Sequence, residues 1–129
     1  MKILVDTSGY AALLAGDRAV LDALARAETV YLSVFVLGEL YAGFRGGRKE
    51  RENRERLASF LAKPSVRILH ATQQTAEVFG AVKDSLRRAG TPIPINDVWI
   101  ASHALETGSR LVTADAHFKH VPGLMRYEG

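Results

Sequence analysis

Short apolar runs alternate with longer amphipathic stretches along this chain, and the alternation predicts strands followed by helices. The apolar runs are rich in β-branched residues, which is typical of strands buried on both faces of a sheet. We expect strands at Lys2–Val5, Thr29–Ser33, Val66–Leu69 and Arg110–Thr113, and a short last strand at Leu124–Tyr127.

Helices are predicted where apolar residues recur at a spacing of three and four. They cover Tyr10–Leu14, Ala19–Ala27, Val34–Phe44, Arg48–Leu61, Thr72–Ala89 and Asp97–Glu106, with a helical turn at Asp115–Lys119. Ser8 or Thr7 is the expected cap of the first helix, Asp17 of the second, and Gly108 ends the last. The segment Thr91–Asn96 is expected to be non-helical because its prolines restrict themselves and their predecessors.

Strands and helices in this order predict an α/β fold with a parallel sheet covered on both faces. The chain has 129 residues and no internal repeat, so we expect a single domain over residues 1–129. It has no cysteine, which excludes disulfides, zinc–thiolate sites and a cysteine nucleophile. No apolar run has the length of a signal peptide or a membrane span, and we therefore expect a cytoplasmic protein without a membrane partner.

Four acidic residues fall where one edge of such a sheet could gather them. Asp6 directly follows the first strand, and Asp115 follows the strand Arg110–Thr113. Ligands of open parallel sheets bind outside the carboxyl ends of the strands. Glu39 lies inside a largely apolar helix, and Asp97 lies at the first turn of another. Each acid alone could be a helix cap or a surface residue, but those separate explanations leave the common placement unexplained.

Crowded carboxylates raise each other's pKa, and such a cluster is costly unless a cation neutralises it. Oxygen ligands select hard divalent ions such as Mg²⁺ or Mn²⁺. Four polar neighbours could orient the acids or a bound water: Thr7, Ser8, Asn96 and Thr113. The pattern therefore favours a divalent metal site at the carboxyl edge of the sheet.

Four short motifs occur in order along the chain. They are Val5-Asp6-Thr7-Ser8, Glu39-Leu40-xx-Gly43, Asn96-Asp97-xx-Ile100-Ala101, and Thr113-Ala114-Asp115-Ala116-His117-Phe118 with the following Val121-Pro122-Gly123-Leu124. In this order they resemble the motifs of the PIN-domain family, and the last is similar to the closing motif of the VapC toxins of type II toxin–antitoxin pairs. Each motif alone is weak, but together they span nearly the whole chain.

The resemblance implies a PIN-like α/β/α sandwich with a central, mainly parallel sheet. It also implies a Mg²⁺- or Mn²⁺-dependent endoribonuclease in which metal-activated water hydrolyses RNA to 5′-phosphate and 3′-hydroxyl ends. By motif position, the catalytic and metal-binding acids would be Asp6, Glu39, Asp97 and Asp115, with Thr113 and Thr7 or Ser8 in support. The implied partners are RNA, a small VapB-like antitoxin and a second copy of the chain.

Basic residues are densest between the second and third acids. The chain has 17 Lys and Arg against 14 Asp and Glu, and most of its positive charge lies outside the candidate site. Arg45, Arg48 and Lys49 are expected to contact RNA phosphates. The competing interpretation is a solvated helix in which Glu and Arg alternate at pairing distance.

Three histidines, His103, His117 and His120, lie near the third and fourth acids in sequence, and we expect them to be structural or surface residues. Trp99 is expected in the core or an interface. The apolar faces of the helices at Tyr10–Leu14 and Val34–Phe44 are expected to pack in the core, and part of this surface could form a dimer or antitoxin groove.

Two other enzyme classes place acids at strand ends, and neither fits. A haloacid dehalogenase-type phosphatase needs a second Asp two residues after the first, where this chain has Ser8. A receiver domain needs an Asp after a middle strand, where His70 follows Val66–Leu69. The alternative that stays open is a catalytically silent PIN-like module that binds RNA or protein.

Overall fold

The computed structural model describes residues 1–128 and confirms the predicted α/β fold. Its strands are β1 (Lys2–Val5), β2 (Thr29–Ser33), β3 (Val66–Leu69), β4 (Arg110–Val112) and β5 (Met125–Arg126). Its helices are α1 (Thr7–Leu14), α2 (Arg18–Arg26), α3 (Val34–Phe44), α4 (Glu50–Leu61), α5 (Gln73–Ala89) and α6 (Ile95–Thr107), with a short 3-10 helix η1 (Ala116–His120). Within residues 1–128, no helix combines the length and the apolar character needed to cross a bilayer.

The strands form one sheet in the order β3-β2-β1-β4-β5, and every neighbouring pair is parallel. The chain moves from β1 to β2 to β3 on one side and then returns to β4 on the other side of β1. The strand order therefore reverses between β1 and β4, which is where open α/β sheets place their ligands. Because Val5 pairs with Val112, the residues that follow β1 and β4 leave the sheet side by side.

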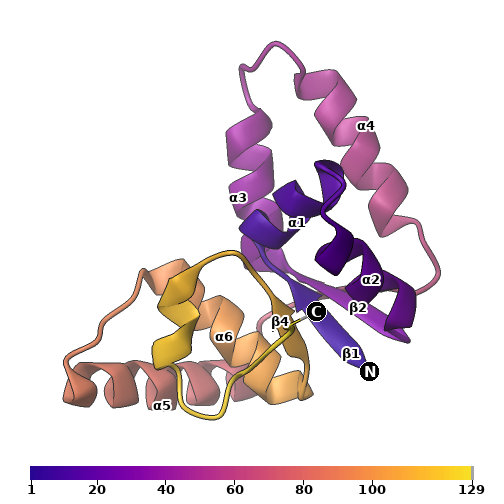
Figure 1. The fold of residues 1–129 in the computed structure, drawn as a ribbon. Coiled ribbons are helices and arrows are strands. Elements are labelled where there is room, and N and C mark those ends of the chain that lie inside the picture. The colour runs from indigo at the N-terminus through magenta and orange to yellow at the C-terminus, as the bar shows by residue number, and fades with distance from the viewer. Residues whose placement is uncertain (129) are drawn as a thin grey trace.

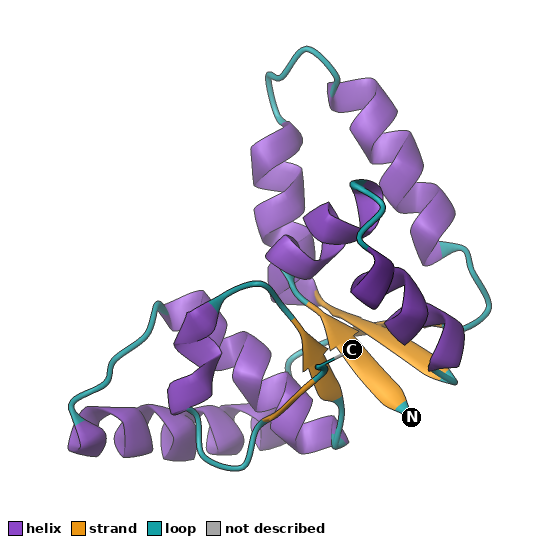
Figure 2. Ribbon diagram, viewed as in Figure 1, coloured by secondary structure: helices purple, strands orange, loops and turns teal. Residues whose placement is uncertain are grey.

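Helices cover the sheet in two groups. Figure 1 shows α1 and α2 over β1 and β2, while α5 and α6 pack on each other at the other end of the molecule. Helices α3 and α4 form an arm that extends past the sheet, and in Figure 2 the strands lie between these helical groups. The core beneath them consists of fully buried aliphatic side chains, including those of Ile3, Leu4, Val5, Leu32 and Leu111.

Helix starts differ from the sequence predictions at two places near the sheet edge. Helix α1 begins at Thr7 and its cap is Asp6, so the prediction of Thr7 or Ser8 as the cap was wrong. Helix α6 begins at Ile95 rather than Asp97, with Pro94 at the N-cap position. Proline is tolerated at the start of a helix because the N–H groups there have no intrahelical partner.

Candidate functional site

Asp6 is buried at the end of β1, with 5% of its surface exposed. Its Oδ1 accepts hydrogen bonds from the Gly9 amide at 2.7 Å and the Ser8 hydroxyl at 2.8 Å. The Thr113 hydroxyl, which follows β4, donates to its Oδ2. Burial raises the pKa of the Asp6 carboxyl, and these hydrogen bonds oppose the rise. The carboxylate is therefore both a helix cap and a fixed part of the sheet edge.

Gly9 allows α1 to begin this close to β4. A Cβ atom built on Gly9 would lie 2.3 Å from the carbonyl oxygen of Val112, which no side chain can accommodate without moving backbone. The same glycine supplies the amide that binds Asp6. A glycine at this position therefore lets the start of α1, and with it Asp6, lie close to the residues after β4.

Hydroxyl groups connect the ends of β1 and β4. Ser8 Oγ lies 3.2 Å from Thr113 Oγ1 and accepts a hydrogen bond from the Ala114 amide at 2.9 Å. Thr113 Oγ1 accepts one from the Asp115 amide at 2.9 Å. Two of the polar residues expected from the sequence, Ser8 and Thr113, therefore hold both Asp6 and the backbone before Asp115.

Glu39 joins the site from α3. Its Oε1 accepts a hydrogen bond from the Thr7 hydroxyl at 2.7 Å, and its side chain is half-buried. Thr7 and Ser8 thus support different acids from adjacent positions. Asn96, the fourth expected supporting residue, lies in the first turn of α6 and makes no side-chain hydrogen bond within residues 1–128.

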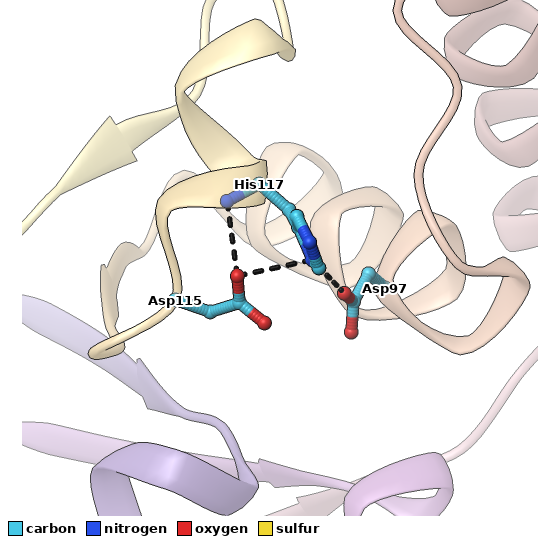
Figure 3. A group of neighbouring side chains, drawn as sticks. All are labelled: Asp97, Asp115 and His117. Atoms are coloured by element: carbon cyan, nitrogen blue, oxygen red, sulfur yellow. Dashed lines mark hydrogen bonds and ion pairs between the residues drawn. The ribbon is translucent and has the colours of Figure 1, made fainter.

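Asp97 and Asp115 meet at His117 (Figure 3). His117 Nδ1 lies 3.3 Å from Asp97 Oδ2 and 3.0 Å from Asp115 Oδ1. Burial raises the pKa of the Asp97 carboxyl, and the like charges of Asp115 and Glu39 raise it further, against the opposing effect of His117. The four acids, which we call the acidic edge, are thus close enough for their charges to interact.

His117 is the site residue that sequence reasoning missed, because we expected it on the surface. The available signal was its position two residues after Asp115, where the turn into η1 folds the side chain back toward the carboxylate.

The expectation for His103 fits the structure: it is buried, and its Nδ1 lies 3.0 Å from Ser33 Oγ. Trp99 packs between Phe35 and Phe79 in an aromatic stack.

The basic residues at the end of the arm have a different environment. Arg45, Arg48 and Lys49, which we call the basic tip, are exposed and form no ion pair within residues 1–128. Further along α4, Arg51 pairs with Glu55 at 3.3 Å and Arg56 with Glu52 at 2.7 Å. The interpretation of a solvated helix with Glu–Arg pairs therefore applies to these two pairs of α4. It does not apply to the basic tip, whose side chains remain available to bind RNA phosphates.

The donor atoms at the acidic edge fit a divalent cation. One ligand atom each from Asp97, Asp115 and His117 lie within 4.8 Å of one another. The carboxylates of Asp6 and Glu39 are held by hydroxyl donors beside them. Burial and the repulsion from Asp115 and Glu39 both raise the pKa of Asp97, and a bound cation would offset this cost of its charged form.

Comparison with known proteins identifies the family of this chain. Residues 3–124 match the family described as the PIN domain. The chain belongs to the PIN-domain family. Among PIN-domain relatives, Ribonuclease VapC2 of Rickettsia felis is 32% identical over 106 residues, which are 81% of this chain and 78% of the relative.

Solved structures of VapBC proteins have the same fold. A crystal structure of VapBC2 from Rickettsia felis bound to a promoter DNA fragment superposes with a TM-score of 0.84 at 28% identity, covering 98% of this chain and 97% of that chain. VapBC-1 from nontypeable Haemophilus influenzae has a TM-score of 0.85 at 22% identity, covering 98% and 96%. The predicted PIN-like α/β/α sandwich is confirmed, and its sheet is entirely parallel.

Proposed function

We propose that this PIN-domain protein is a metal-dependent endoribonuclease and the toxin of a toxin–antitoxin pair. The observation that carries the proposal is the acidic edge, where Asp6, Glu39, Asp97 and Asp115 converge at the strand-order reversal of a PIN sheet. The 32% identical relative is named a ribonuclease. The intact set of four acids also disfavours a silent binding module, because such a module has no use for the cost of crowding carboxylates.

In this proposal the acidic edge holds Mg²⁺ or Mn²⁺, which supplies charge neutralisation on the phosphate and an activated water. Asp97 and Asp115 are more exposed than Asp6 and would hold the cation. Asp6 is fixed by the Gly9 amide and the Ser8 and Thr113 hydroxyls, so it keeps its place as charge changes at the site. Glu39 is oriented by Thr7.

RNA would reach the site along the arm. The α-helical rise of 1.5 Å per residue puts Arg45 about 9 Å along α3 from Glu39, within the span of a few nucleotides. Unpaired cations there attract phosphates without selecting a sequence. The basic tip would therefore guide the RNA strand toward the acidic edge.

The proposal is tested by incubating purified, antitoxin-free protein with total cellular RNA in Mg²⁺, in Mn²⁺ and in EDTA. We expect discrete fragments in the presence of either metal and none in EDTA. Metal-dependent thermal stabilisation without cleavage of any RNA would instead favour the silent binding module.

A groove between α1 and α4 is our proposed antitoxin site. It has a volume of about 590 Å³, and it combines apolar side chains (Tyr10, Leu13, Leu14 and Phe60) with polar and charged ones from α4 and the turn after it (Glu52, Glu55, Arg56, Ser59 and Lys63). Leu14 is 49% exposed, whereas Tyr10 is buried. A segment that places an apolar side chain against Leu14 would cover this surface, and the VapBC2 structure contains the toxin and antitoxin together.

The antitoxin proposal separates binding from catalysis. A Leu14→Arg substitution should abolish inhibition by the co-expressed antitoxin and leave RNA cleavage intact, because Leu14 lies outside the acidic edge. Unchanged inhibition would place the antitoxin elsewhere. Sedimentation of the antitoxin-free protein tests the homodimer that the family resemblance implies, and a purely monomeric species would contradict it.

A further inference from the structure

His117 brings a nitrogen donor to a site whose other charged groups are carboxylates. Its imidazole points between Asp97 and Asp115 (Figure 3), and its Nδ1 is 3.0 Å from one carboxylate oxygen and 3.3 Å from the other. The His117 amide donates to Asp115 Oδ1 at 3.0 Å, which fixes the start of η1 against that acid. The side chain is still 51% exposed, so its contacts with the two carboxylates, rather than burial, hold the ring there.

We propose that His117 supplies a nitrogen ligand to the cation at the acidic edge, so that the centre binds Mn²⁺ in preference to Mg²⁺. The inference rests on the proposed function, which places a divalent cation at these acids. Mg²⁺ strongly favours oxygen ligands, whereas imidazole suits the transition metals. A mixed nitrogen and oxygen set therefore shifts selectivity away from Mg²⁺.

The distances from the His117 nitrogen to the two carboxylate oxygens are compatible with shared coordination. Ligands at adjacent corners of an octahedron lie about 3 Å apart when each is about 2.1 Å from the ion. The Nδ1–Oδ distances of 3.0 and 3.3 Å match that edge length. Neither of the other histidines on α6 and η1 has this placement: His103 is buried against Ser33, and His120 is exposed at the end of η1.

The experiment compares metal-stripped wild type with His117→Gln and the matched control His120→Gln. Mn²⁺ affinity is measured by electron paramagnetic resonance of the free ion, and Mg²⁺ affinity by competition with Mn²⁺. Pulsed measurements on the bound Mn²⁺ detect hyperfine coupling to a ligand nitrogen, and ¹⁵N-labelled histidine identifies its source. RNA cleavage with and without EDTA is recorded on the same samples.

We expect histidine nitrogen coupling in wild type and His120→Gln and its loss in His117→Gln. Mn²⁺ affinity of His117→Gln should fall by at least the roughly 10-fold typical of losing an outer-sphere partner, with a smaller change for Mg²⁺. The wild-type spectrum answers the question even if His117→Gln folds poorly.

Two results would overturn the inference, and they are distinguishable. In the first, wild type binds Mn²⁺ without histidine coupling, and His117→Gln has an unchanged ratio of Mn²⁺ affinity to Mg²⁺ affinity. His117 would then be a hydrogen-bond partner only, and the proposed nuclease would stand. Wild type that binds no Mn²⁺, with RNA cleavage that persists in EDTA, would remove the metal centre and the proposed function together.

Discussion

Two regions of the molecule gather like charges, the acidic edge and the basic tip, and they differ in how those charges are held. At the acidic edge, backbone amides and hydroxyls hold Asp6 and Glu39, and burial raises the pKa of Asp6 and Asp97. At the basic tip, Arg45, Arg48 and Lys49 extend into solvent without ion pairs among residues 1–128. At the acidic edge, specific hydrogen bonds therefore fix the position of individual carboxylates. At the basic tip, each charge makes a small contribution to the local electrostatic potential.

The largest effect should come from a single atom change at the acidic edge. Asp97→Asn removes a carboxylate charge that faces Asp115 and His117 and should lower RNA cleavage by more than the roughly 10- to 100-fold cost of losing an outer-sphere partner. Single-turnover cleavage at saturating metal measures it. Equal cleavage by wild type and Asp97→Asn would indicate a contaminating nuclease and remove Asp97 from the site.

The closest packing beside the acidic edge should be nearly as sensitive. Gly9→Ala places a Cβ against the Val112 carbonyl and should cost about 1–3 kcal/mol of the free energy of unfolding, as overpacking does. Urea denaturation measures it. Gly38→Ala is the matched control, since a Cβ there meets no atom within 4 Å, and it should stabilise α3 by up to about 1 kcal/mol. A Gly9→Ala protein as stable as wild type would contradict the close approach.

Charge at the acidic edge should also cost stability when metal is absent. Because the folded-state pKa values of Asp6 and Asp97 are raised above 3.8, their contribution to stability is full below the unfolded pKa and is lost as pH rises through the folded pKa. In EDTA, Asp97→Asn should therefore have a higher Tm than wild type near neutral pH, and the difference should shrink toward about pH 4. Titrating groups that do not interact with Asp97 cancel in this difference. A lower Tm for Asp97→Asn near neutral pH would show that the interaction of Asp97 with His117 outweighs its burial and the repulsion from the other acids.

At the basic tip, no single residue should dominate. Reversing Arg45 and Arg48 to Glu should weaken RNA binding and lower the slope of log affinity against log salt by about 1 for each RNA phosphate that is no longer neutralised. Fluorescence anisotropy with labelled RNA across a salt series measures both. Arg51→Glu makes a comparable charge change on the same arm, but Arg51 is already paired with Glu55, so its effect per residue should be smaller. Equal effects per residue would reduce the basic tip to net charge alone.

The smallest effect should come from the ion pairs of α4. Arg51→Gln removes one exposed pair to Glu55 and should change the free energy of unfolding by less than about 0.5 kcal/mol. Chemical denaturation measures it, and a loss above about 1 kcal/mol would mean that the arm depends on this pair. The stability of the fold would then depend on an ion pair of the arm.

Much of this architecture could be predicted from the sequence. Apolar runs and strand-end positions indicated the strands and placed Asp6 and Asp115 at one edge, because parallel strands end together. The sequence could not show that Asp6 is itself the cap of α1, since a carboxylate and a hydroxyl at neighbouring positions serve equally well as caps. The position of His117 two residues after Asp115 was only a weak signal, because its place at the site depends on the turn into η1 and not on a periodic pattern. The sequence indicated all four acids. It could not indicate the hydrogen bond from the Thr7 hydroxyl to Glu39, because the two residues are brought together only by the tertiary fold.

The chemistry at the ends of cleaved RNA tests the central claim most directly. Fragments produced by the purified protein in Mg²⁺ or Mn²⁺ would be sequenced by methods that require defined ends. Hydrolysis at the acidic edge predicts 5′-phosphate and 3′-hydroxyl ends, formed only with metal and absent from Asp97→Asn. A 2′,3′-cyclic phosphate would contradict the account, because it shows attack by the ribose hydroxyl rather than by water.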